Sequence, residues 1–253
     1  MKRKGSLFEI IASEENLKVA SWKAMRGKRT KRDVLLFNLN FEENLTALRK
    51  DLLDGTIAIG NYHYFQVHEP KERTICAASF PERILHHAIM NVCLPVFENY
   101  QIYDSYACRE GKGTHKALLR AFHFSKSTPF FLKVDIRKYF DSIDHIILKN
   151  LLCRKFKDEK LLELLYRIID SYETAPGKGL PIGNLTSQHM ANFYLGRADH
   201  YIKEELGTRR YVRYMDDFVL WDSDMNGLLN DRNCHFDFMT ILGRKMGFLP
   251  QSK

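Results

Sequence analysis

Two adjacent carboxylates, Asp216 and Asp217, lie between runs of large apolar and aromatic residues in the stretch VRYMDDFVLW (212–221). Unpaired charge is costly in such surroundings, so a neutralising partner is expected. No lysine or arginine follows Arg213 for many positions downstream, which limits compensation by a local ion pair. A divalent cation is the alternative, and Mg²⁺ is a hard ion that binds carboxylate oxygens.

A two-metal site for phosphoryl transfer needs a further carboxylate, and Asp135 is the best candidate. It ends the apolar, strand-like stretch PFFLKVD (129–135). Two ions about 3.5–4 Å apart would flank a phosphate, one activating the attacking oxygen and the other steadying the leaving group. Asp141 and Asp144 follow, but carboxylates at the start of a helix are explained more simply by the helix dipole.

Apolar periodicity predicts the elements that would position these carboxylates. RRYVRY and FVLW are expected as two strands joined across Met215, Asp216 and Asp217, so that the turn presents both acidic side chains. The other expected elements are a helix at 34–53, strand-like alternation at 57–80, a helix from Pro81 that Pro95 ends or kinks, a helix after Ser142, and helices at 158–172 and 186–206. The pattern predicts an α+β fold with an antiparallel hairpin packed on helices.

Composition narrows the class of protein. The chain has 253 residues, 45% of them hydrophobic, which suits one sizeable core or a two-lobed domain. Its net charge of +8 indicates a polyanionic partner such as nucleic acid, although solvated surface lysine and arginine explain it equally well. The five cysteines include no CxxC pair, which argues against structural zinc and disulfides. No apolar run has membrane-span length and no signal peptide is evident, so a cytoplasmic protein without membrane association is expected.

Three motifs in fixed order resemble the central motifs of reverse transcriptases: FLKVDIRKYFDSIDH, GLPIGNLTSQHMANFYL and RYVRYMDDFVLW. The stretch from KERTICAASF to GKGTHKAL (71–118) resembles the fingers motifs of the bacterial branch shared with group II introns. The resemblance implies a right-hand polymerase with fingers and palm, the palm being an antiparallel sheet backed by helices. It places an N-terminal extension and fingers at 1–125 and the palm at 126–253, with 146–180 returning to the fingers. The match fades after Trp221, so the thumb is expected to be missing.

The resemblance also assigns the metal ligands. It makes Asp135, Asp216 and Asp217 the catalytic carboxylates holding two Mg²⁺ ions, with Mn²⁺ as a substitute. Ile136 would add a backbone carbonyl to one ion. The implied reaction is RNA-directed DNA synthesis by two-metal nucleotidyl transfer, with an RNA template, a DNA or RNA primer and dNTPs as substrates.

Nucleotide contacts follow from the same resemblance. Arg73, assisted by Lys71, matches a basic fingers residue that contacts the triphosphate. Phe140 matches the bulky gate that excludes a ribose 2′-hydroxyl, although the sequence alone favours a core aromatic at this position. Ile182, Gly183 and Gln188 lie in the loop and helix start that would face the nucleotide.

The loop IGNLTSQ (182–188) points to a subfamily. Most relatives carry glutamine where this chain has Ile182, and the loop resembles that of the reverse transcriptases of diversity-generating retroelements. Those enzymes copy a template-repeat RNA, misincorporate opposite adenine and commonly bind a small basic accessory protein. Glutamine can form hydrogen bonds near the nucleotide whereas isoleucine only packs, so discrimination would rest more on shape. A harmless apolar substitution is the alternative explanation.

Three alternatives to this assignment stay open. One is a group II intron-like reverse transcriptase, the second is a defence-associated one, and the third is a thumbless, inactive relative that only binds RNA. The presence of all three carboxylates argues against the third.

Overall fold

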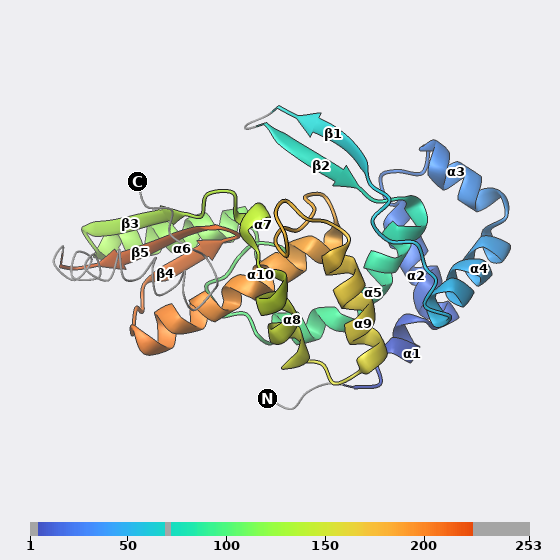
Figure 1. The fold of residues 1–253 in the computed structure, drawn as a ribbon. Coiled ribbons are helices and arrows are strands. Elements are labelled where there is room, and N and C mark those ends of the chain that lie inside the picture. Colours follow the sequence, from blue (N-terminus) through green and yellow to red (C-terminus); the bar gives the residue numbers. More distant parts are fainter. Residues whose placement is uncertain (1–4, 69–71, 225–253) are drawn as a thin grey trace. The chain divides into compact units, whose positions relative to one another are not determined.

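The computed structural model describes residues 5–68 and 72–224, which form helices and two antiparallel sheets (Figure 1). This confirms the α+β class. The chain divides into two compact units. Three helices contain the points where the chain passes from one unit to the other: α5 (Phe80–Glu98), α8 (His145–Cys153) and α10 (Leu185–His200).

The first unit is made of residues 1–96 and 149–189. Its second segment overlaps the stretch 146–180 that the resemblance returns to the fingers. Besides parts of the crossing helices, it contains α1 (Phe8–Ile11), α2 (Glu14–Met25), α3 (Arg32–Leu39), α4 (Phe41–Leu53), α9 (Glu159–Asp170), β1 (His63–Val67) and β2 (Arg73–Ala77).

Helices α3 and α4 correct one prediction. The periodicity of 34–53 predicted a single helix, but Asn40 interrupts it with φ −128° and ψ 56°. Asparagine readily leaves helical geometry because its side chain competes for backbone hydrogen bonds. The periodicity continues through the break, so it gave no sign of a change in direction.

Helix α9 illustrates why the amphipathic segments fold as predicted. The carboxylate of Asp158 accepts a hydrogen bond from the Leu161 backbone N–H at 3.2 Å, which satisfies one donor of the first turn. The apolar face is buried: Leu161, Leu164, Leu165, Ile168 and Ile169. A further oxygen of Asp158 accepts the backbone N–H groups of Leu7 and Phe8, which ties α1 to the same cap.

Helix α5 begins with Pro81 in its first turn, as predicted. Pro95 does not end the helix, which continues to Glu98. Proline removes one hydrogen bond to the preceding turn. Burial of Cys93 and Val96 on either side of Pro95 favours the helical path here.

The strand-like region 57–80 forms a two-stranded antiparallel ribbon. Strands β1 and β2 pair from His63 opposite Ala77 to Val67 opposite Arg73. All five residues of β1 are exposed, so the ribbon is held by its ladder and by the more buried end of β2.

The second unit is built on a three-stranded sheet of order β3-β5-β4, with both pairs antiparallel (Figure 1). Its strands are β3 (Phe130–Asp135), β5 (Asp217–Asp222) and β4 (Tyr211–Tyr214), which confirms the predicted strand and hairpin. The unit also contains α6 (Thr114–Ser127), the short α7 (Tyr139–Ser142) and a π-helical turn, Tyr201–Glu205, that extends α10.

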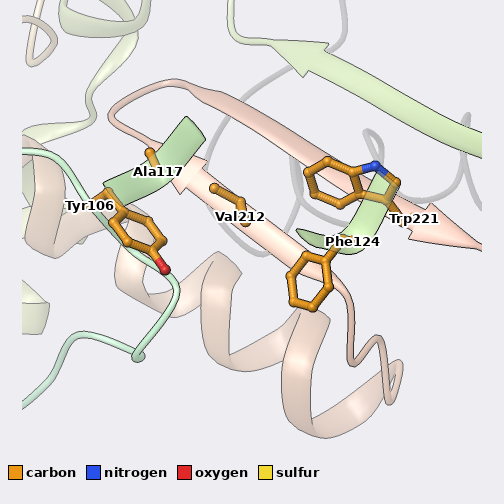
Figure 2. Close-up of a cluster of buried hydrophobic side chains, with 5 residues drawn as sticks. All are labelled: Tyr106, Ala117, Phe124, Val212 and Trp221. Atoms are coloured by element: carbon orange, nitrogen blue, oxygen red, sulfur yellow. The ribbon is translucent and has the colours of Figure 1, made fainter. Parts of the chain in front are cut away.

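Helix α6 packs against β4 and β5 through a buried apolar cluster. Tyr106, Ala117 and Phe124 meet Val212 and Trp221 there, as Figure 2 shows. The Trp221 indole N–H donates to the Ser125 hydroxyl at 2.9 Å, which fixes the ring at the cluster edge. Residues 97–125 belong to the second unit together with this sheet.

No helix within the described ranges is long and apolar enough to cross a membrane. The predicted absence of a thumb concerns residues after Trp221, most of which lie outside the described ranges.

Candidate active site

The turn between β4 and β5 consists of two residues, Met215 and Asp216, and β5 begins at Asp217. Met215 adopts a left-handed conformation with φ 54°, which is uncommon for a residue with a side chain. Such a conformation costs about 1–3 kcal/mol and persists when surrounding contacts determine it. The strand ladder on both sides therefore holds a strained backbone directly before the two aspartates.

Asp135 lies directly across from Asp217 in the β3–β5 ladder. Side chains of residues opposite each other in an antiparallel pair leave the sheet on the same face, with Cβ atoms about 4.5–5.5 Å apart. Asp135 and Asp217 are exposed, and Asp216 is half-buried. The register thus brings together two carboxylates that are far apart in the sequence, beside the turn that carries the third.

A basic partner for this site comes from β3. The Lys133 ammonium lies 3.2 Å from Asp217 Oδ1, with 61% and 50% of the two side chains exposed. The absence of a lysine or arginine soon after Arg213 predicted little ion pairing, and this prediction is wrong because the partner comes from a neighbouring strand. An exposed pair of this kind contributes about 0–1 kcal/mol, and a divalent cation could displace it at little cost.

The three carboxylates suit Mg²⁺, because carboxylate oxygens are its preferred protein ligands. The ammonium of Lys133 beside Asp217 shows that a positive charge is already bound at this position. Within the ranges that the structure describes, no three histidine, cysteine, aspartate or glutamate side chains converge as a ligand set. Ile136, which would add a backbone carbonyl, directly follows β3 and is 7% exposed.

Phe140 lies in the short helix α7 and is half-buried. Its ring packs edge-on against Tyr139, with centroids 5.7 Å apart and planes at 71°. Tyr139 is buried, and its hydroxyl donates to the backbone carbonyl of Ala191. Burial raises the pKa of Tyr139 well above its ordinary value, so it stays a donor at neutral pH. Phe140 is therefore not a fully buried core aromatic, and it rests on a firmly held neighbour.

The remaining predicted nucleotide-contact residues that the structure describes lie in the first unit. Gln188 is among them, although its helix, α10, continues into the second unit. Arg73 begins β2 and is exposed. Lys71 lies outside the described residues. Gln188 is half-buried near the start of α10, where its backbone N–H donates to the Asn184 carbonyl at 3.2 Å.

The loop containing Ile182 is attached to β2. The Ile182 carbonyl accepts the Cys76 backbone N–H at 2.7 Å. Gly183 has φ 116°, and a Cβ at this position would lie 2.7 Å from Ile75 Cγ2. Only glycine combines this φ with so close an approach to a strand. The loop and the strand of Arg73 are therefore held together as one surface.

A family model described as reverse transcriptase (RNA-dependent DNA polymerase) matches residues 67–246, which is more than half of the chain. The chain belongs to the reverse transcriptase family. The matched range includes both the β1–β2 ribbon and the sheet that carries the three aspartates.

Individual members of the family are distant relatives. An uncharacterized 91 kDa protein in the cob intron of Schizosaccharomyces pombe is 27% identical over 178 residues, which cover 68% of this chain and 21% of the relative. The group II intron-encoded protein LtrA of Lactococcus lactis is 26% identical over 172 residues, 64% of this chain and 28% of that protein. The chain thus spans less than a third of the length of these curated relatives.

A solved structure supports the same fold. Telomerase from Candida albicans, in complex with a fragment of telomeric RNA, superimposes with a TM-score of 0.51 at 13% identity. The superposition covers 72% of this chain and 40% of telomerase. At this level of identity the likeness supports the reverse transcriptase fold and nothing finer.

The sequence-based prediction missed two residues at the candidate site. Lys133 lies two residues before Asp135, so strand alternation could have placed both on one face. Arg213 is fully buried next to the turn. An arginine inside the apolar strand YVRY was the available signal, because a buried charge requires a dedicated partner.

Proposed function

We propose that the chain is the polymerase core of an RNA-directed DNA polymerase that copies an RNA template into cDNA. The observation that carries this proposal is the pairing of Asp135 with Asp217 at the end of the sheet, beside the turn with Asp216. Family membership supplies the reaction class. The net charge of +8 supports a polyanionic partner, here an RNA template with a DNA or RNA primer.

In the proposed reaction the primer 3′-hydroxyl attacks the α-phosphate of a dNTP and pyrophosphate leaves. Bound Mg²⁺ would neutralise phosphate charge and lower the pKa of the attacking hydroxyl. Asp135, Asp216 and Asp217 would hold two such ions through their carboxylate oxygens, with the Ile136 carbonyl as an added ligand. The protein's contribution is then mainly positioning and electrostatic stabilisation.

Two side chains would select the nucleotide. The exposed guanidinium of Arg73 would bind the triphosphate, because a planar fork of N–H donors suits phosphate oxygens. The half-buried ring of Phe140 would exclude a ribose 2′-hydroxyl.

Within the family, the loop at Ile182 supports the error-prone enzyme of a diversity-generating retroelement. The curated relatives support the other candidate, an intron-encoded reverse transcriptase, since they include proteins of group II and mitochondrial introns. The two candidates share the polymerase reaction and differ in fidelity at template adenines.

The purified chain should extend a labelled DNA primer on an RNA template when dNTPs and Mg²⁺ are present, and should stop when Mg²⁺ is chelated. Product length on denaturing gels is the measurement. Binding of the template–primer without any extension, in either Mg²⁺ or Mn²⁺, would instead support an inactive RNA-binding relative.

Replacing Ile182 by glutamine should lower misincorporation opposite template adenine several-fold. One added hydrogen bond to the nucleotide contributes on the order of 1 kcal/mol. The loop should keep its path, because the Ile182 carbonyl, not its side chain, is bonded to Cys76. The measurement is sequencing of cDNA copied from an RNA with all four bases in many contexts.

Ile182→Leu is the matched control, since it stays apolar and should keep the adenine errors of the unchanged chain. An error spectrum without adenine bias, or one that Ile182→Gln leaves unchanged, would remove the support for the retroelement assignment. The polymerase assignment would stand.

A further inference from the structure

Arg213, in the middle of β4, is a completely buried charge. Its relative exposure is 0%, as is that of Asp199, which it meets through two contacts. Arg213 Nε donates to Asp199 Oδ1 at 2.7 Å, and Nη2 donates to Oδ2 at 2.6 Å. This bidentate ion pair offsets the free-energy cost of removing both charges from water.

The rest of the guanidinium is directed to acceptors of Gln101, Asn192 and Met215. Nη2 also donates to Gln101 Oε1 at 3.0 Å, and Nη1 donates to Asn192 Oδ1 at 2.7 Å. The last contact is from Nη1 to the backbone carbonyl of Met215 at 3.0 Å. A guanidinium has five N–H donors, and each of the five has an acceptor here.

The acceptors away from the turn are themselves held. The Tyr211 hydroxyl donates to Asp199 Oδ1 at 2.7 Å, and burial raises the pKa of Tyr211 so that it stays a donor. The Asn192 amide donates to the Ala107 carbonyl at 2.9 Å. Burial alone would lower the pKa of Arg213, but Asp199 raises it above its ordinary value, so the charge persists. The guanidinium is therefore held by acceptors whose own positions are fixed by hydrogen bonds.

The contact to Met215 reaches the strained residue of the turn, whose φ is 54°. The Met215 carbonyl and the Asp216 backbone N–H belong to one planar peptide group. Holding that carbonyl therefore fixes the peptide plane from which the Asp216 side chain departs.

We propose that Arg213 is a positioning residue that links Asp199 to the Met215 carbonyl and so holds Asp216 in the orientation needed to bind a divalent cation. This inference rests on the proposed function, because it assigns cation binding to Asp216. Lysine could keep the charge opposite Asp199, but its single nitrogen cannot reach both carboxylate oxygens and the turn.

The test compares Arg213→Lys with Arg109→Lys in the full chain. Arg109 resembles Arg213 in its bonds: Nε donates to Glu98 at 2.7 Å, and Nη1 donates to the carbonyls of Ile102 and Ser105. None of these acceptors belongs to the turn. Both replacements should lower the midpoint of thermal unfolding, so stability alone does not distinguish them.

Cation affinity distinguishes them. Binding of Mn²⁺ to the chain without nucleic acid or nucleotide is measured by electron paramagnetic resonance, and the Mg²⁺ concentration for half-maximal primer extension is measured separately. Arg213→Lys should weaken both by about tenfold, with the rate recovering at high Mg²⁺, while Arg109→Lys should change neither. Equal cation affinities in the two variants would make Arg213 a purely structural residue and overturn the proposal.

Gln101→Met gives a second test that leaves the buried ion pair intact, should Arg213→Lys fail to fold. It removes one acceptor of Nη2, so it should weaken Mn²⁺ binding by about threefold, and unchanged binding would count against the proposal.

Asp216→Asn distinguishes a failure of the positioning role of Arg213 from a failure of the metal assignment itself. If it binds Mn²⁺ as tightly as the unchanged chain, cation binding at Asp216 is wrong, and the metal assignment in the proposed function fails together with the positioning role.

Discussion

Replacing Asp216 by asparagine is expected to reduce dNTP incorporation by about a thousandfold, and Asp135→Asn should do the same. Removing one preorganised group that stabilises the transition state costs about 10²–10³ in rate, and each aspartate is proposed to hold a cation as well. The two replacements should have similar effects because both aspartates lie beside Asp217. Asp135 is opposite Asp217 in the strand ladder, and Asp216 precedes Asp217 in the chain. Primer extension at saturating Mg²⁺ is the measurement.

These variants should fold normally. Asparagine is nearly isosteric with aspartate, and the ion pair of Lys133 with Asp217 at this edge is exposed and weak. Asp222→Asn is the matched control, because Asp222 lies at the other end of β5, opposite Phe130. Extension by Asp216→Asn at the rate of the Asp222→Asn control would sink the assignment of these carboxylates to the metals.

Replacing Phe140 by valine should raise the use of rNTPs relative to dNTPs by about tenfold or more. A pocket wall that excludes a substituent by shape gives discrimination of about 10–200-fold, and valine would remove most of that wall. The half-buried ring packs on Tyr139, so the change should also cost about 0.5–1.5 kcal/mol of stability through the lost ring contact. The measurement is the ratio of incorporation efficiencies for matched rNTP and dNTP.

Phe131→Val is the control for this prediction, because Phe131 is an exposed aromatic of the same unit on β3, with 65% of its surface accessible. It should leave the sugar ratio unchanged. A Phe140→Val variant with lowered stability and an unchanged sugar ratio would mean that Phe140 only packs.

The local pattern of apolar and polar residues was sufficient to predict most helices and strands of the second unit. A short apolar stretch predicted β3, and the apolar runs on both sides of Met215 and Asp216 predicted the hairpin. The same kind of reasoning was wrong at Asn40, and of the two outcomes expected at Pro95, an end or a kink, the end of the helix is not observed. The predicted helix breaks at Asn40 although the periodicity continues, and α5 continues through Pro95 although proline disfavours it. At Pro95 the burial of neighbouring residues outweighs a local preference of about 3 kcal/mol, whereas at Asn40 the local preference of asparagine outweighs the helical periodicity.

The sequence by itself determined which residue types the candidate site contains. It determined the three aspartates proposed as ligands, the strands that carry them, and the motif order typical of reverse transcriptases, since each depends on residue type and short-range spacing. The tertiary structure alone decided which residues meet. The register places Asp135 opposite Asp217, Lys133 supplies the counter-charge, and Asp199 reaches Arg213 from 14 positions away. Periodicity reports which face of an element is apolar, but a contact between distant segments depends on how whole elements pack, and that information is not local.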